Sequence, residues 1–151
     1  MERGALSTSL SALLVLFLAQ FSVGMSFNLL VTFPTNAFPA SGGSLTATFN
    51  YILTGGDLLL TSHAIIDIAI VVVAAVNLAL VIHRSNVYKI LSVTSLILVL
   101  VALVNGERFV ASNFSINGIS FGMAMPFITV FTLYFVEAML MYRDIAVKTQ
   151  P

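Results

Sequence analysis

Residues 58–82, "LLLTSHAIIDIAIVVVAAVNLALVI", decide the fold of this chain. A helix needs about 20 consecutive apolar residues to span the hydrocarbon core of a bilayer. Only His63, Asp67 and Asn77 are strongly polar in this run. The run therefore predicts a transmembrane helix that carries ionisable side chains where they are costly.

The composition of the whole sequence agrees with a membrane protein. Of its 151 residues, 59% are hydrophobic and 8% are charged, whereas a soluble domain carries roughly 25% charged residues. The formal net charge is zero and there is no basic block, which excludes nucleic acid as a partner. The sequence has no cysteine, which excludes disulfides, thiolate nucleophiles, Cys-ligated zinc and iron–sulfur clusters.

Three further stretches are apolar over a similar length, at 10–32, 88–104 and 119–141. The sequence therefore predicts an all-α, antiparallel four-helix transmembrane bundle in a single domain, with a long outer loop over 33–57. The first helix is expected to be retained, because its apolar run is longer than the roughly 7–15 residues of a signal-peptide core. Pro126 lies near the start of the fourth helix, where a neighbour must satisfy the carbonyl that the proline leaves free.

The connections between these helices carry weaker signals. Residues 44–51, "SLTATFNY", alternate small polar and apolar side chains, a pattern that favours an extended segment or a small hairpin. A disordered loop is the alternative. Residues 105–109, "NGERF", contain a turn signal and are expected to end the third helix.

Basic residues predict the orientation, because cytoplasmic loops carry an excess of Lys and Arg. Five of the six basic residues fall on one side of the predicted bundle: Arg3, Arg84, Lys89, Arg143 and Lys148. Both termini are therefore predicted to be cytoplasmic, in a multi-pass protein of the cell membrane. Glu137 lies near the same side and is expected to approach Arg84, Lys89 or Arg143, and a role in proton relay is the alternative.

Polar residues gather toward the outer ends of the predicted helices. Ionisable residues in membrane spans face the bundle interior or water, because exposure to lipid costs roughly 2.5–3.5 kcal/mol each. The sequence thus predicts a structural polar cluster of Asn28, Asp67, Asn105, Glu107 and Arg108. Within it, Arg108 is expected to anchor the rim of the bundle, and the alternatives are a salt bridge with Asp67 or Asp57 or the binding of an anionic group.

His63 and Asp67 lie one turn apart on one helical stripe. At 100° per residue this stripe continues through Ile70, Ala74, Asn77 and Val81. Asp67 is placed to accept a ring N–H from His63, which would fix the tautomer and free the other nitrogen. The simplest interpretation is that the pair holds the bundle together, and the alternatives are haem or metal ligation and proton or solute transfer.

A ligand site is the more specific interpretation. His63 is predicted to lie at the same depth as Met123 and Met125, and a histidine with a methionine can hold a b-type haem. Successive side chains turn by 100°, so these methionines point roughly 200° apart and only one can face the core. Met25 on the first helix is a further candidate at that depth. Methionine is also a common apolar filler. His63 and Asp67 are the candidate ligands if the site holds a metal instead.

Four segments carry a resemblance to known proteins: "GMSFNLLVTFP", "SHAIIDIAI", "NGERF" and "SFGMAMPF". In these the chain resembles uncharacterised families of small prokaryotic four-helix membrane proteins. In architecture it is similar to the four-helix haem-binding units of haem A synthase and cytochrome b561-like proteins. That resemblance implies axial histidines on facing helices, and here only His63 matches such a position, because the fourth helix has methionines instead.

These observations predict an accessory or structural subunit of a larger membrane complex, with an outward-facing polar site. Its expected partners are the lipid bilayer and other membrane subunits or further copies of the chain. A haem- or metal-binding electron-transfer protein is the first alternative, and a small transporter or channel component is the second. The sequence has no P-loop, HExxH or GxSxG motif, so the chemistry of a soluble-type enzyme is not expected.

Overall fold

A computed structural model describes residues 2–30, 44–54, 57–114 and 116–148, apart from the side chains of a few residues at helix ends. This part of the chain is helical apart from short connections, and it contains no strand. Its helices are α1 (Glu2–Leu30), α2 (Leu45–Thr54), α3 (Leu58–Val81), α4 (Asn86–Ala111) and α5 (Asn117–Lys148).

Four of the helices are long and apolar enough to cross a membrane. The candidate spans are Gly4–Phe27, Leu58–Val81, Asn86–Ala111 and Gly118–Ala146. Large apolar side chains point outward along them, for example Val15 (64% exposed), Ile97 (56%) and Phe121 (66%). A surface of this kind is suited to lipid contact, and the protein is accordingly a multi-pass membrane protein.

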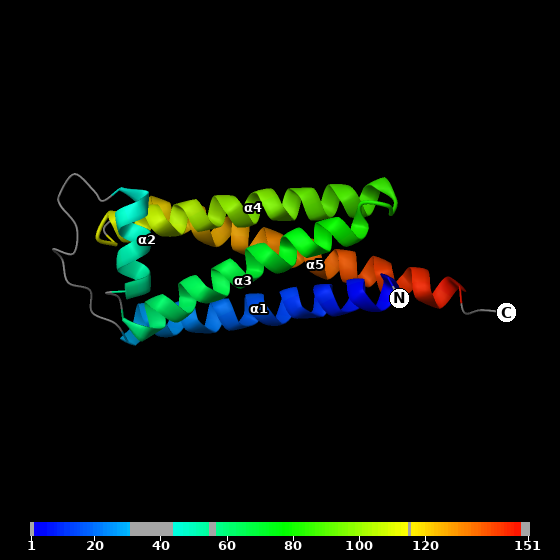
Figure 1. Cartoon of the computed structure of the whole chain (residues 1–151), viewed down its shortest axis with the longest axis horizontal. Helices are drawn as coiled ribbons and strands as arrows, with labels where there is room; N and C mark the ends of the chain where they lie inside the picture. Colours follow the sequence, from blue (N-terminus) through cyan, green and yellow to red (C-terminus); the bar gives the residue numbers. More distant parts are fainter. Residues whose placement is uncertain (1, 31–43, 55–56, 115, 149–151) are drawn as a thin grey trace.

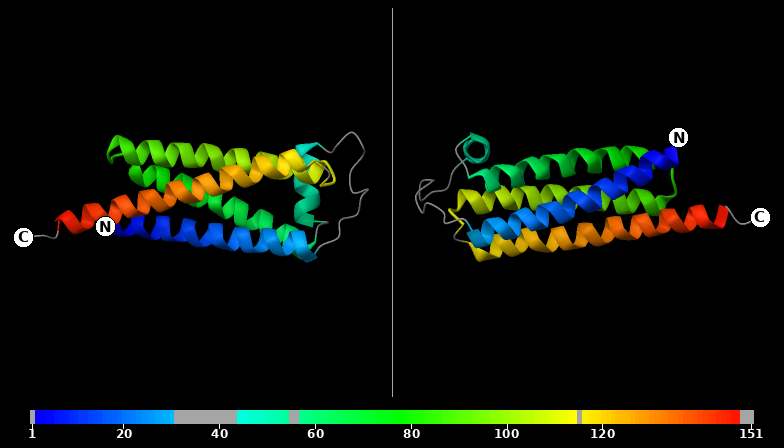
Figure 2. Two further views of the ribbon diagram at one scale, coloured as in Figure 1. Left: turned by 180° about the vertical axis from the view of Figure 1, so that it is seen from behind. Right: turned by 90° about the horizontal axis from the view of Figure 1, so that it is seen from below.

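The long helices lie side by side, and both termini lie toward one end, which we call the terminal end (Figure 1). The short helix α2 lies across the opposite end, which we call the α2 end. There α1 and α3 form one pair, and α4 and α5 form the other (Figures 1 and 2). Toward the terminal end α3 approaches α4, and α5 approaches α1. The two pairs therefore diverge toward the α2 end.

The core is continuous in the terminal half. The helix α1 contributes a stripe at helical spacing, Leu6, Leu10, Leu13 and Phe17, with at most 3% exposure. The predicted stripe of α3 is confirmed over its second half, where Ile70, Ala74, Asn77 and Val81 are all buried. Val130 and Tyr134 of α5 complete this core. Its side chains interlock as expected for helices that pack closely along their length.

Both weaker predictions about the connections are wrong. Residues 45–54 form α2 rather than a strand or hairpin, and the Ser44 hydroxyl caps this helix by accepting a hydrogen bond from the Ala47 N–H (3.2 Å). The helix α4 continues through "NGERF" to Ala111. It ends just before Asn113 and Phe114, whose φ angles of 51° and 59° are left-handed. A glycine within a membrane helix did not act as a stop signal here, because such helices accept glycine more readily than soluble ones.

Candidate functional site

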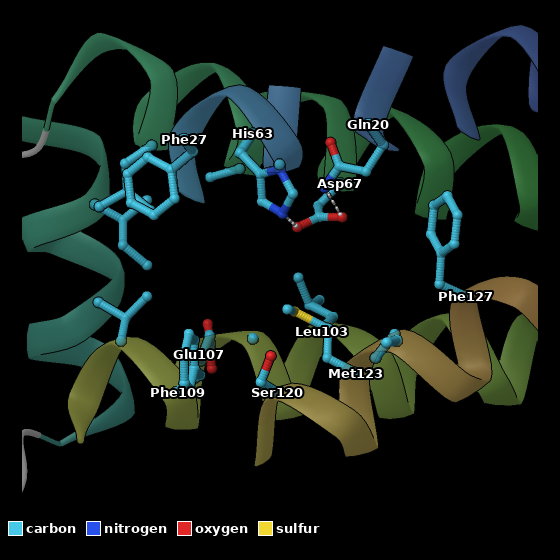
Figure 3. A pocket seen from close by; sticks show the side chains of 18 of the residues that line it. Gln20, Phe27, His63, Asp67, Leu103, Glu107, Phe109, Ser120, Met123 and Phe127 are labelled. Atoms are coloured by element: carbon cyan, nitrogen blue, oxygen red, sulfur yellow. Dashed lines mark hydrogen bonds and ion pairs between the residues drawn. The ribbon is translucent and has the colours of Figure 1, made fainter. Parts of the chain in front are cut away.

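A cavity of about 290 Å³ lies where the two helix pairs diverge, beneath α2. All five helices contribute to its wall. Figure 3 shows Gln20, His63 and Asp67 on one wall, and Leu103, Glu107, Ser120 and Met123 on the other. Most of the remaining lining is aromatic or aliphatic, and its phenylalanines are Phe21, Phe27, Phe49, Phe109, Phe114 and Phe127. Ligand sites typically have this composition, an apolar wall with a few polar groups.

The polar wall is a triad of side chains from α1 and α3. The Gln20 amide donates a hydrogen bond to Asp67 Oδ1 (2.5 Å). His63 Nε2 lies 4.0 Å from Asp67 Oδ2, so the predicted pair is brought together but makes no direct hydrogen bond. Two buried polar atoms of this triad, His63 Nδ1 and Gln20 Oε1, have no hydrogen-bond partner. Sequence reasoning missed Gln20, although a lone glutamine within an apolar helix was the available signal.

The position of the His63 ring depends on Gly24 of α1. A Cβ atom at Gly24 would lie 3.0 Å from His63 Cε1 and 3.5 Å from His63 Nδ1. Any larger residue at this position must therefore displace the ring. The close approach of α1 and α3 at this point is the kind that small residues permit in membrane helices.

The opposite wall of the cavity contains Met123 and not Met125. Met123 lines the cavity, and its sulfur would be 3.5 Å from a Cβ at Gly106. Met125 is 47% exposed and does not line the cavity. Glu107 and Ser120 contribute the oxygen atoms of this wall. His63 and Met123 thus face the same space from opposite sides.

The five residues of the predicted polar cluster do not all line the cavity. Asp67 and Glu107 line it, whereas Arg108 is exposed and does not. Of the alternatives for Arg108, the pair with Asp67 is not formed, and Asp67 contacts Gln20 and His63 instead. The side chain of Asn28 lies outside the described residues.

Asn105 has a structural role that Pro126 explains. A proline has no N–H, so Pro126 leaves the carbonyl of Gly122, four residues earlier, without its helical partner. Asn105 Nδ2 of α4 donates to this Gly122 carbonyl oxygen (3.0 Å). A Cβ at Gly122 would lie only 3.3 Å from that nitrogen. The expected satisfaction of the freed carbonyl by a neighbouring helix is thus confirmed.

Metal and haem place different demands on this cavity. Among the described residues, no group of three or more His, Cys, Asp or Glu side chains could hold a metal ion, so His63 and Asp67 have no third partner of these types. For a haem, the cavity brings His63 together with Met123, and Met25 also lines it. The geometry therefore leaves His63 with a methionine as the candidate ligand pair for haem, and an incomplete set for a metal among the described residues.

A second polar cluster lies in the terminal half, and we call it the Glu137 network. Asn77 Nδ2 donates to Ser92 Oγ and to Glu137 Oε1 (both 3.0 Å), and Ser9 donates to Asn77 Oδ1 (3.2 Å). Ser92 Oγ lies 3.0 Å from both oxygens of Glu137. Each of the four long helices contributes one residue. Glu137 itself is fully buried, so its predicted approach to a basic residue at the membrane surface is wrong.

The signal for this network was present in the sequence. Ser9, Asn77, Ser92 and Glu137 are one polar residue per helix at matching depth, but the predicted end of the last helix at 141 placed Glu137 near the membrane boundary. The helix α5 continues to Lys148. Glu137 therefore lies more than two turns inside the helix, where the other three residues reach it.

Comparisons with models of protein families, with characterised proteins and with solved structures find no match for this chain. Its chemistry is accordingly inferred from the geometry of its two polar sites.

Proposed function

We propose that this protein is an antiparallel four-helix bundle of the cell membrane, with both termini cytoplasmic, whose cavity binds a small lipophilic molecule through a hydrogen-bond-donating head group. One observation carries the proposal: buried His63 Nδ1 and Gln20 Oε1 lack partners at the edge of an apolar cavity. A buried polar group without a partner costs about 1–3 kcal/mol. A ligand that supplied the missing partners would recover this cost.

The hydrogen-bond polarity of the wall selects the head group. Gln20 Oε1 is an acceptor. If the His63 Nε2 hydrogen points to the nearby Asp67 carboxyl, His63 Nδ1 is an acceptor as well. Two carboxyl side chains, Asp67 and Glu107, line the cavity, and none of its described lining residues is Lys or Arg. This wall favours an amino or hydroxyl head group over a carboxylate.

The lining also indicates the route of entry. Phe21 and Met25 of α1 and Ile128 of α5 line the cavity, yet they are 56%, 44% and 59% exposed. The cavity therefore reaches the apolar outer surface between α1 and α5. A lipophilic ligand would enter from the bilayer through this opening.

The binding proposal is tested with three eight-carbon probes that differ in head group: octylamine, 1-octanol and octanoate. Thermal unfolding of the purified protein is followed by circular dichroism in detergent. We expect octylamine and octanol to raise the Tm and octanoate to leave it unchanged. At a probe concentration 100 times the Kd the expected stabilisation is about 2.7 kcal/mol.

Two variants separate binding in the cavity from general effects on the detergent. Gln20→Leu removes an acceptor from the wall and should abolish the shift. Asp144→Asn removes a carboxyl at the far end of α5, outside the cavity, and should preserve it. Equal shifts with all three probes, or an undiminished shift in Gln20→Leu, would show that the cavity does not select this chemistry.

The orientation is tested with single cysteines in this cysteine-free chain. Thr46 on α2 and Ser85 before α4 are both exposed and lie at opposite ends of the bundle. An impermeant maleimide added to intact cells should label Thr46→Cys and not Ser85→Cys. The reverse pattern would place the termini outside.

A b-type haem is the second candidate, because His63 and Met123 face one another across the cavity. An absorption spectrum of the purified protein decides it: a Soret band that is lost in His63→Leu and shifted in Met123→Leu would assign the cavity to haem. The role of an accessory subunit and the role of a transporter component stay predictions, since the cavity is compatible with either.

A further inference from the structure

The Glu137 network has features that the cavity does not explain. Glu137, Asn77 and Ser92 are fully buried, and Ser9 is 6% exposed. A carboxyl in the interior of a membrane bundle is costly, so such a residue is a candidate functional site by default. The network lies within the core of the terminal half, and none of its four residues lines the cavity, so it does not contact a ligand bound there.

The surroundings of Glu137 contain no positive charge. Asn77 from α3 and Ser92 from α4 contact its oxygens, and Ser9 from α1 contacts Asn77. Tyr134 from α5 itself is close enough to interact electrostatically with Glu137, and Ser95 from α4 lies beside Tyr134. Within the described part of the chain, no Lys, Arg or His lies within ion-pair distance of its oxygens. An isolated buried carboxylate pays a large desolvation penalty, which a bound proton removes.

The hydrogen bonds also leave room for one proton. Ser92 has a single hydroxyl hydrogen but lies 3.0 Å from both Glu137 oxygens. An ionised Glu137 could receive this hydrogen at only one oxygen at a time. In a protonated Glu137, one oxygen accepts from Ser92 while the other donates to it, so that both contacts carry a hydrogen.

The packing favours a proton over a metal cation. All contacts in the network are direct, at 3.0–3.2 Å. Asn77 also turns its amide nitrogen, not its oxygen, toward Ser92 and Glu137. A cation at this point would face a donor group and would have to displace existing hydrogen bonds.

Access to the network is different on its two sides. Toward the terminal end it is closed by buried Leu6, Val81 and Met141. Toward the cavity, one turn from Ser92 and Glu137, lie Ser95 and Tyr134, which are fully buried. Their hydroxyls lie close to one another, but neither makes a hydrogen bond of good geometry. Two such hydroxyls beside a buried carboxyl are the groups that a water molecule would join into a path.

We propose that Glu137 is a proton-binding site, and that its proton exchanges toward the cavity by way of Tyr134 and Ser95. An apolar layer separates this path from the cavity, and its centre is Phe17. The ring of Phe17 lies 5.3 Å from that of Phe127 at the cavity and 6.1 Å from that of Tyr134 (centroid distances). Rotation of this one aromatic side chain would open the layer to water.

Infrared spectroscopy of the purified protein tests the bound proton directly, because a protonated carboxyl has a carbonyl band that a carboxylate lacks. We expect such a band at neutral pH, its loss in Glu137→Gln and its persistence in Asp144→Asn. Gln should preserve the fold, since its amide group donates where the protonated carboxyl does. The same band should shift when the glutamates of the wild-type protein carry carbon-13, which excludes Asp67 as its source. It should also persist in Glu107→Gln, which excludes the glutamate at the cavity even if Glu137→Gln does not fold.

The exchange path is tested by transfer of the protein into deuterium oxide. The shift of the Glu137 band should be slower in Tyr134→Phe and in Ser95→Ala than in the wild type. Tyr88→Phe, a tyrosine change on the terminal side, should leave the rate unchanged. A wild type without the band, or a band position that responds to sodium ions, would overturn the proton site. Equal exchange rates in Tyr134→Phe and Tyr88→Phe would overturn the path.

Discussion

The hydrogen bond from Asn105 to the Gly122 carbonyl leads to a specific prediction, because its contribution to stability depends on Pro126. Asn105→Leu removes the amide that donates to this carbonyl (3.0 Å) and replaces it by an apolar side chain of similar size. In the wild-type chain the carbonyl then has no donor, since Pro126 has no N–H. In a Pro126→Ala background the N–H of residue 126 is restored and can take over the carbonyl as in an ordinary helix.

The expected loss in the free energy of unfolding differs between the chain with Pro126 and the chain with Ala at this position. An interhelical hydrogen bond in a membrane bundle contributes about 0.6 kcal/mol on average and about 1.7 kcal/mol at most. Leaving a buried acceptor unsatisfied costs about 1–3 kcal/mol. We therefore expect Asn105→Leu to lower the free energy of unfolding by about 1–3 kcal/mol in the wild-type background. In the Pro126→Ala background we expect a loss of about 0.6 kcal/mol or less.

Reversible unfolding in mixed micelles, titrated with a denaturing detergent and followed by circular dichroism, measures both losses. The two single variants and the double variant form a thermodynamic cycle. A coupling energy near zero, with Asn105→Leu equally costly in both backgrounds, would refute the reasoning. It would mean that Asn105 stabilises the bundle by packing rather than by serving the carbonyl that the proline frees.

Two further predictions concern the polar wall of the cavity. Gly24→Ala should destabilise the protein, because the new Cβ lies 3.0 Å from the His63 ring. Gly106→Ala meets only an ordinary contact at 3.5 Å and serves as the control in the same unfolding assay. Equal effects of the two variants would argue against a tight fit at His63. Asp67 should be coupled more strongly to Gln20, 2.5 Å away, than to His63 at 4.0 Å. Double-mutant cycles of Leu substitutions should give a coupling free energy of about 1 kcal/mol for Asp67 with Gln20 and less than about 0.5 kcal/mol for Asp67 with His63. The opposite order would show that the histidine is the main partner of the carboxyl.

The sequence predicted the parts of the fold that depend on length and hydropathy. The second transmembrane run, predicted at 58–82, corresponds to α3 at Leu58–Val81. The buried positions on its second half also follow from the 100° period. These features are local, since the bilayer imposes both the length of a span and the need to bury its polar face.

Helix ends were predicted less well, because they depend on what surrounds the helix. The turn signal at Gly106 is ineffective within an apolar helix that packs on α5, so α4 continues to Ala111. The segment around Thr48 has the alternation of a strand, but it lies across the bundle end as a helix, with Thr48 fully buried. Tertiary burial decided both cases, and a propensity scale does not contain that information.

The candidate site was predicted in part for the same reason. His63 and Asp67 were found because they interrupt an apolar run, and Met123 because it matches the depth of His63. Gln20 and the Glu137 network depend on the relative tilt and length of four helices. Depth matching fails when one predicted helix end is displaced by two turns, as happened for α5.

The attachment of α2 has a mechanical consequence. Asp57 caps α3 by accepting from the Leu59 N–H (2.7 Å), and the Thr61 hydroxyl of α3 donates to the Ile52 carbonyl of α2 (2.8 Å). The helix α2, which covers the cavity, is thereby attached to α3, and its backbone also lies close to α4 but not to α1 or α5. A small rotation of α3 would therefore move α2 with it, whereas no helix bridges the bilayer-facing opening between α1 and α5. The cavity is thus stiff across α3 and α4 and compliant across α1 and α5. A bulky ligand would be accommodated by separation of α1 from α5, which widens the cavity toward the lipid.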